Sequence, residues 1–115
     1  GWLDMPALRY SVMLNGVTDL IMTKADVLSG LETIKVCDAY KCADKMYDMP
    51  DIPAGCLPDL IIKEMNGWSA DITTTTQANQ LPPALTEYSR FVEKSAGAHL
   101  SYISTGPDRE QIIKL

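Results

Sequence analysis

A Lys-x-Asp triplet, Lys24-Ala25-Asp26, follows an apolar run, Leu20 to Thr23, that predicts a short buried strand. The edge of guanine presents two neighbouring donors, the N1–H and the exocyclic amino group, and one carboxylate accepts from both in a charge-assisted pair. Adenine lacks this donor pair, so Asp26 would select guanine. Lys24 can lay its aliphatic stem along the purine face, with its ammonium near the ring. Alone, the triplet is equally compatible with a solvated turn.

A second loop, Ser104-Thr105-Gly106-Pro107, follows another predicted strand, Leu100 to Ser104. Gly106 lets a backbone approach a flat ligand closely, and Pro107 offers a rigid apolar plate for a ring face. The Ser104 hydroxyl and backbone N–H groups can reach the carbonyl or ring nitrogens of a base. An ordinary turn between strands is the alternative. If the two strands run parallel in one sheet, both loops emerge at its carboxyl edge, where open α/β sheets bind ligands.

No set of catalytic residues is evident elsewhere. The only histidine, His99, starts a predicted strand and fits a surface position, and no Ser-His-Asp or Cys-His combination can be argued. Neither G-x-x-x-x-G-K-[ST] nor G-x-G-x-x-G occurs, so no loop is typical of a phosphate cradle. We therefore predict no catalytic residue and no metal ligand in the chain, and we exclude a stand-alone GTPase or kinase.

Charge and cysteine content narrow the function further. The net charge is −5 with only 10 Lys and Arg, which argues against nucleic-acid or anionic-membrane binding. No leader peptide or membrane-spanning run is evident. The three cysteines, Cys37, Cys42 and Cys56, are odd in number and lack CxxC spacing, which argues against a zinc site and a disulfide framework. Reduced thiols in a cytoplasmic protein are expected.

The patterning predicts one α/β domain over residues 1–115, with a mixed sheet and flanking helices. A first helix should begin after Asp4, carry Pro6 in its first turn and end at Asn15-Gly16. A second helix should begin at Pro82-Pro83 and end at Gly97. The helical faces predicted to be apolar are Met5, Leu8, Val12 and Met13 in the first helix, and Leu85, Tyr88, Val92 and Ala96, with Phe91 beside them, in the second.

Five segments have strand patterns, and the region between the second and the third is irregular. The predicted strands are Asp19 to Thr23, Thr33 to Tyr40, Leu60 to Met65, Leu100 to Ser104 and Ile112 to Leu115, the first and fourth of which precede the two loops above. A short helical or turn segment is expected from Asp26 to Leu31. Regular structure in the middle of the chain is broken by Met49-Pro50, Ile52-Pro53, Gly55 and Leu57-Pro58. The run Thr73 to Thr76 indicates an exposed loop without a specific role.

Ordered stretches along nearly the whole chain resemble the C-terminal part of adenylosuccinate synthetase. They are Gly1-Trp2-Leu3-Asp4, Ala7-Leu8-Arg9-Tyr10-Ser11, Thr23-Lys24-Ala25-Asp26-Val27-Leu28, Gly30-Leu31, Ile34-Lys35-Val36-Cys37 with Ala39-Tyr40, Gly67-Trp68, and Ile103-Ser104-Thr105-Gly106-Pro107-Asp108-Arg109. The match weakens only across roughly Lys41 to Leu60. The family usually has Leu at the position of Ala25, a departure that leaves Lys24 and Asp26 intact but is expected to loosen the local packing.

The resemblance implies the C-terminal portion of a larger, P-loop-like single-domain enzyme. Enzymes of this family join inosine monophosphate (IMP) to L-aspartate with GTP and Mg²⁺, in AMP biosynthesis. By the resemblance, Asp26 accepts from the guanine edge and Lys24 packs on the ring. Ala25 lies between them, and Ser104, Thr105, Gly106 and Pro107 line the other side.

The resemblance also implies that the catalytic groups, phosphate loop, magnesium ligands and most of the IMP pocket lie outside these residues. The chain begins at Gly1-Trp2, where the family's aspartate-binding loop ends, so we expect a piece of a longer, homodimeric enzyme that is inactive alone. The alternative is a free-standing nucleotide-binding or scaffold domain without ligase activity. We expect isolated residues 1–115 to bind GTP weakly if at all, because the resemblance implies that the phosphate and magnesium contacts lie elsewhere.

Overall fold

Two mixed sheets and two α-helices make up the chain, which is described over residues 1–115 by a computed structural model. One sheet contains β1, β3, β4 and β5, and the other has the order β2-β6-β7. The elements are β1 (Leu3–Asp4), α1 (Met5–Asn15), β2 (Asp19–Met22), the 3-10 helix η1 (Ala25–Leu28), β3 (Thr33–Cys42), β4 (Lys45–Tyr47), β5 (Asp59–Asn66), η2 (Ala78–Gln80), α2 (Pro83–Ala96), β6 (His99–Ser104) and β7 (Ile112–Lys114). The predicted mixed α/β class is therefore confirmed, with the strands divided between two sheets.

Helix α1 begins and ends as its sequence predicts. The Asp4 side chain accepts a hydrogen bond from the Ala7 N–H, and Gly16 ends the helix in the left-handed conformation with φ of 60°. Met5 is fully buried, but Met13 is 60% exposed. The prediction that Met13 faces the core is wrong, because only the beginning of α1 and the Leu8–Val12 side pack against the rest of the chain.

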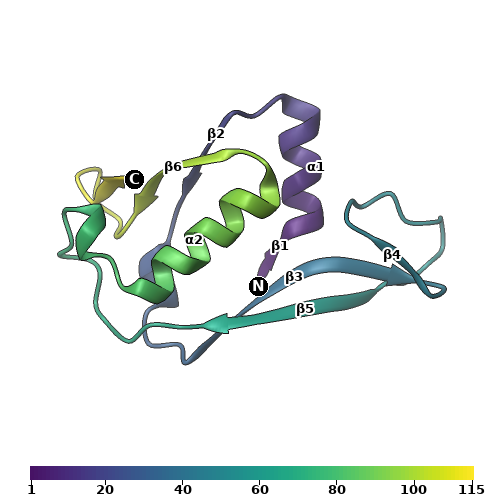
Figure 1. Cartoon of the computed structure of the whole chain (residues 1–115), viewed down its shortest axis with the longest axis horizontal. Coiled ribbons are helices and arrows are strands. Elements are labelled where there is room, and N and C mark those ends of the chain that lie inside the picture. Colours follow the sequence, from purple (N-terminus) through teal and green to yellow (C-terminus); the bar gives the residue numbers. More distant parts are fainter.

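Helix α2 carries the apolar stripe around which the two sheets pack. Leu85, Tyr88, Val92 and Ala96 are all buried, as predicted. The helix lies between β6 and the long ribbon formed by β3 and β5 (Figure 1). The buried core joins this stripe to Ile34 and Val36 of β3 and to Leu100 and Ile103 of β6. Burying each large apolar side chain stabilises the fold by about 1.5–3 kcal/mol.

Arg9 of α1 is hydrogen-bonded to β3 and to α2. Its guanidinium donates to the Asp38 carboxylate at 2.7 Å and to the backbone oxygen of Asp38 at 2.7 Å. Its Nε donates to the backbone oxygen of Ser95, near the end of α2, at 3.0 Å. The Arg9 side chain is only 15% exposed, so these charge-assisted bonds fix α1 against β3 and α2.

Sheet β2-β6-β7 is covered by α2 on one face. Leu100 and Ile103 of β6 point to this covered face and are buried, whereas Ile21 of β2 is 59% exposed. The prediction of a fully buried β2 is therefore wrong within this chain: its burial alternates, as expected for a strand covered on one side. No helix of the chain has the length and apolar character to cross a membrane.

The stretch predicted to be irregular forms the tip of the β3–β5 ribbon. Strand β4 pairs antiparallel with the end of β3, and its turn places Ala43 and Asp44 at positive φ. The chain then returns so that Cys56 meets Cys42 in a disulfide, with Cα atoms 6.4 Å apart. The prediction of three reduced thiols is wrong for these two residues, because their contact depends on this return path and not on sequence spacing. Cys37 is free and buried, and burial raises its thiol pKa.

Thiol counting checks the disulfide directly. In denaturant without reductant, titration with a chromogenic disulfide reagent should find one thiol per chain, from Cys37, and three after reduction. The variant Cys37→Ser should give no thiol before reduction. Three thiols in the unreduced chain would contradict the Cys42–Cys56 pairing.

Candidate functional site

Strands β2 and β6 run parallel and side by side, and this places the two candidate loops together. Asp19 pairs with His99 and Met22 pairs with Ile103, with one register shift between Leu20 and Ile21. Both strands therefore end at the same edge of the sheet, where neighbouring strands are about 4.8 Å apart. The conditional expectation of parallel strands is confirmed, and the loops after Met22 and Ser104 leave from adjacent positions.

The first loop turns sharply at Lys24. This residue has φ of 58°, in the left-handed region that only Gly, Asn and Asp visit readily. The turn starts η1, in which Ala25 is completely buried and Asp26 is half-buried. Neither Lys24 nor Asp26 takes part in an ion pair of the chain. The strained turn at Lys24 therefore leaves two groups near the sheet edge without an ion-pair partner: the Lys24 ammonium and the Asp26 carboxylate.

The second loop is folded on Gln111. Thr105 is completely buried, and its backbone N–H donates to the backbone oxygen of Gln111 at 2.8 Å. The Ser104 hydroxyl donates to the backbone oxygen of Gly106 at 3.0 Å. The N–H of Gly106 donates to no backbone acceptor, and Pro107 is exposed. The donors that remain for a ligand are therefore the Gly106 N–H and, after rotation, the Ser104 hydroxyl.

The fold requires glycine at position 106 because of a contact that the sequence does not indicate. A Cβ at this position would lie 2.1 Å from Oε1 of Gln111, far inside contact distance. That oxygen accepts the Asp108 N–H at 3.0 Å. The sequence predicts that a ligand approaches the backbone of Gly106 closely. In the structure, the group that approaches Gly106 closely is the Gln111 side chain.

Hollows lie at several places on the surface of the chain, and one of them lies beside the second candidate loop. A hollow of about 570 Å³ lies between Thr73–Thr76 and Asp108–Gln111, beside the second loop. A larger hollow of about 670 Å³ is lined by Thr86, Arg90 and Glu93 of α2 and by His99, and it contains no residue of either loop. We favour the sheet edge over the larger hollow, because both candidate loops leave the sheet at this edge and neither contributes a residue to the hollow.

Sequence reasoning missed three residues that hold the loops in place. The backbone oxygen of Trp68 accepts the Gly30 N–H at 2.8 Å, and Trp68 Nε1 donates to the Ser29 hydroxyl at 3.0 Å. A Cβ on Gly67 would lie 1.8 Å from the backbone oxygen of Leu31, so only glycine fits there. Gln111 organises the second loop. Gly67-Trp68 belongs to the stretches that resemble the family, so its importance could have been found, whereas no sequence pattern indicates the role of Gln111.

His99 is exposed, as predicted, and is paired with a carboxylate. Its Nδ1 lies 2.7 Å from Oε2 of Glu93, which also accepts the Leu100 N–H at 2.7 Å. The bond from the Leu100 N–H, with a smaller contribution from His99, holds the pKa of Glu93 below its ordinary value. No group of three His, Cys, Asp or Glu side chains is placed to hold a metal ion.

Comparison with known proteins gives one family. The family model described as Adenylosuccinate synthetase matches residues 1–113. Adenylosuccinate synthetase of Christiangramia forsetii is 45% identical over 115 residues, which cover 98% of this chain and 27% of the relative. The synthetase of Bacteroides thetaiotaomicron is 43% identical over 116 residues, covering 99% of this chain and 27% of the relative.

A solved structure points to the same family. Fully ligated adenylosuccinate synthetase from Plasmodium falciparum matches all of this chain with a TM-score of 0.89 and 29% identity, over 28% of its own length. The chain thus spans 27% of the length of the curated relatives above.

The left-handed backbone of Lys24 leads to a stability prediction. Because a left-handed L-residue costs about 1–2 kcal/mol, Lys24→Gly should raise the free energy of unfolding of residues 1–115 by up to about 1 kcal/mol in urea denaturation. The control is Lys114→Gly, at an exposed lysine in strand β7, which should lower it by about 0.5–1 kcal/mol. Equal destabilisation by both substitutions would show that Lys24 is not strained.

Proposed function

Because the chain belongs to the adenylosuccinate synthetase family, we propose that it forms the part of a GTP-dependent ligase that binds the guanine base of GTP. The complete enzyme would join IMP to L-aspartate and release adenylosuccinate, GDP and phosphate. We propose residues 1–115 as its C-terminal guanine-recognition region. This assignment goes beyond family membership and depends on the two loops.

The observation that supports it most strongly is the parallel pairing of β2 with β6. This pairing brings Lys24 and Asp26 to the same sheet edge as Ser104 to Pro107, although about 80 residues separate them in sequence. A flat base at this edge has one set of polar groups on each side. Such an arrangement suits a purine better than a compact anion, because the edge presents a carboxylate and offers no cradle of backbone N–H groups.

Asp26 supplies the base specificity in this proposal. Its carboxylate is half-buried and unpaired within the chain, so it is available to accept from guanine N1–H and from the exocyclic amino group. Lys24 precedes it by two residues and is exposed, so its stem can cover the purine face. Ala25, fully buried between them, anchors the turn on the core.

The second loop forms the other side of the base pocket. The Gly106 N–H, which has no backbone acceptor, can donate to a base oxygen or ring nitrogen, and so can the Ser104 hydroxyl. Pro107 is exposed and provides an apolar surface for the ring. Thr105 is buried with its N–H already bonded, so its contribution is to fix the backbone on either side.

The reacting end of GTP belongs to other regions of the complete enzyme in this proposal. Those regions would bind the phosphates, Mg²⁺, IMP and L-aspartate, and the complete enzyme would act as a homodimer. Residues 1–115 alone would then be inactive. A free-standing nucleotide-binding or scaffold domain without ligase activity is the competing proposal, and it has no observation in its favour.

Substituting Asp26 tests the proposal. In the complete synthetase polypeptide, Asp26→Ala should raise the KM for GTP by about 10- to 100-fold, because losing a charge-assisted hydrogen-bonded pair costs about 1.5–3 kcal/mol. The kcat and the KM values for IMP and L-aspartate should change little in steady-state kinetics. The preference for GTP over inosine triphosphate, which lacks the exocyclic amino group, should also shrink.

Asp51→Ala is the matched control, since Asp51 is an exposed aspartate in the irregular segment before Cys56. It should leave the KM for GTP unchanged. If Asp26→Ala leaves this constant and the triphosphate preference unchanged, Asp26 does not contact the base and the proposed site is wrong.

A further inference from the structure

One segment, the connection between β5 and η2 at residues 67–77, is bonded to residues that follow each of the candidate loops in sequence; we call it the strap. At its first end, Gly67 N–H donates to the backbone oxygen of Glu32 at 2.9 Å. The next residue, Trp68, accepts the Gly30 N–H at 2.8 Å and donates to the Ser29 hydroxyl at 3.0 Å. Ser29 directly follows η1, so these bonds hold the segment that carries Asp26.

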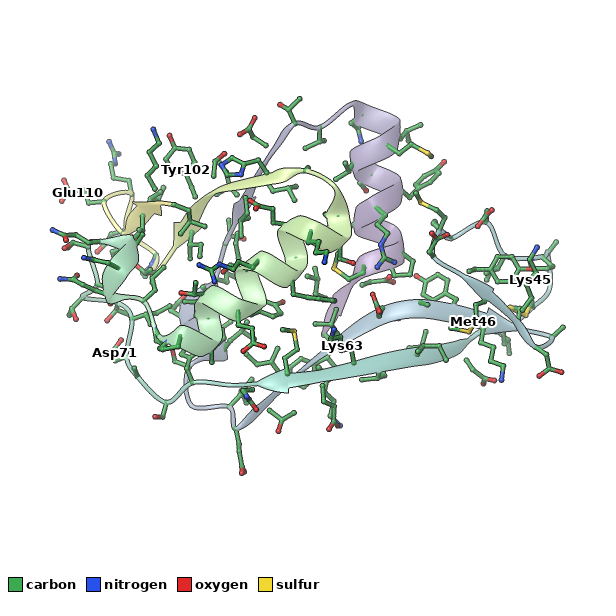
Figure 2. All side chains as sticks on the ribbon, viewed as in Figure 1. Lys45, Met46, Lys63, Asp71, Tyr102 and Glu110 are labelled. Carbon is green, nitrogen blue, oxygen red and sulfur yellow. A yellow bond between two sulfur atoms is a disulfide. The ribbon has the colours of Figure 1, made fainter.

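The other end of the strap reaches the second loop through Gln111. Nε2 of Gln111 donates to the backbone oxygen of Thr73 at 3.0 Å. The same side chain accepts the Asp108 N–H, and its backbone oxygen accepts the Thr105 N–H. Gln111 thus connects the strap to the backbone of the loop that runs from Ser104 to Asp108. Figure 2 places Asp71 of the strap and Glu110, next to Gln111, at the same end of the molecule.

The strap is itself fixed between its two ends. Trp68 is 5% exposed and lies against Tyr88 of α2, and Ile72 is 1% exposed in the core. Asp71 accepts the Thr73 N–H at 2.9 Å and the Thr73 hydroxyl at 2.7 Å. These two bonds hold the pKa of Asp71 below its ordinary value, so its carboxylate stays charged and the Thr73 backbone stays in place.

We propose that the strap positions the two halves of the guanine site relative to each other, with Trp68 and Gln111 as its positioning residues. The inference rests on the proposed function, since it assumes that both loops meet the base. The run Thr73 to Thr76 then gains a role that its sequence does not indicate: it carries the carbonyl to which Gln111 is tied.

The hydrogen bonds of the strap matter because both loops must be restrained for a base to bind between them. The first loop leaves the sheet at the end of β2, and the second connects β6 to its antiparallel neighbour β7. Neither strand pairing fixes the distance between the two loops, and connecting loops are mobile unless other contacts restrain them. A base held from two sides binds tightly only if both sides are held at the correct separation beforehand. The strap supplies this restraint because Trp68 is bonded to the turn after the first loop and Thr73 is bonded to Gln111 after the second, while Ile72 between them is packed in the core.

Kinetics of the complete synthetase test the inference. Gln111→Met keeps the length of the side chain but removes its amide, and Trp68→Phe keeps an aromatic ring against Tyr88 but removes the N–H donor. Trp68→Phe removes one side-chain hydrogen bond and Gln111→Met removes two, so each variant should raise the KM for GTP about three- to tenfold. The kcat at saturating GTP and the KM for IMP should stay unchanged, which a general loss of structure would not produce. If Gln111→Met does not fold, Gln111→Ala replaces it.

The double variant distinguishes one strap from two unrelated contacts. If both residues act through one tie, releasing either end removes the restraint, and Trp68→Phe with Gln111→Met should raise the KM for GTP no more than the larger single change. A rise equal to the product of the two single changes would overturn the inference, as would unchanged KM values in both single variants.

Thr74→Ala and Glu110→Ala are the matched controls, because both residues are exposed neighbours of the tie and Thr74 lies in the strap itself. Both should leave the KM for GTP unchanged. The outcome for Asp26→Ala separates the two levels of the proposal. A large effect of Asp26→Ala with no effect of the strap variants contradicts only the strap, whereas no effect of Asp26→Ala contradicts the guanine site.

Discussion

The parallel pairing of β2 with β6 is the constraint on which the rest of the arrangement depends. Two parallel strands need a crossover connection, and here the crossover contains η1, the whole β3–β5 ribbon and α2. Helix α2 lies on this sheet and buries the inner face of β6 (Figure 1). Because the pairing aligns the carboxyl ends of both strands, two loops from opposite ends of the chain leave the sheet as neighbours.

The packing around this pair explains why a short piece of chain can hold a defined edge. The stripe on α2 contacts β6 on one side and the β3–β5 ribbon on the other, so one helix organises both sheets. Arg9 then fixes α1 to β3 and to the end of α2 by charge-assisted bonds. The Lys24 turn lies on the buried Ala25, and the left-handed strain at Lys24 is compensated by this surrounding packing.

Local signals in the sequence predicted the helices well. Asp4, Gly16 and Gly97 mark helix ends through their own side-chain or backbone properties, and the stripe on α2 follows from helical spacing. The apolar runs before both loops also predict strands, and these strands are β2 and β6, which pair in parallel. The Lys24 and Ser104 loops could be identified as candidates because a particular chemistry needs those residue types.

Features that depend on distant contacts could not be predicted. Cys42 meets Cys56 only because of the path taken around β4, and β1, with 2 residues, is too short to leave a pattern. Met13 and Ile21 have apolar side chains that suggest burial, yet no element of the chain covers them. Gln111 resembles any polar residue after a turn until its contacts with Thr73 and Asp108 are seen.

A crystal structure of the complete synthetase polypeptide with GDP tests the central claim most directly, and the decisive measurement is the distance from the Asp26 carboxylate to the base. The account predicts that its two oxygens lie about 2.7–3.1 Å from guanine N1 and from the exocyclic nitrogen. It also predicts that the base lies between Lys24 and the loop Ser104 to Pro107. Density for the guanine at another surface, with Asp26 facing solvent, would contradict the account.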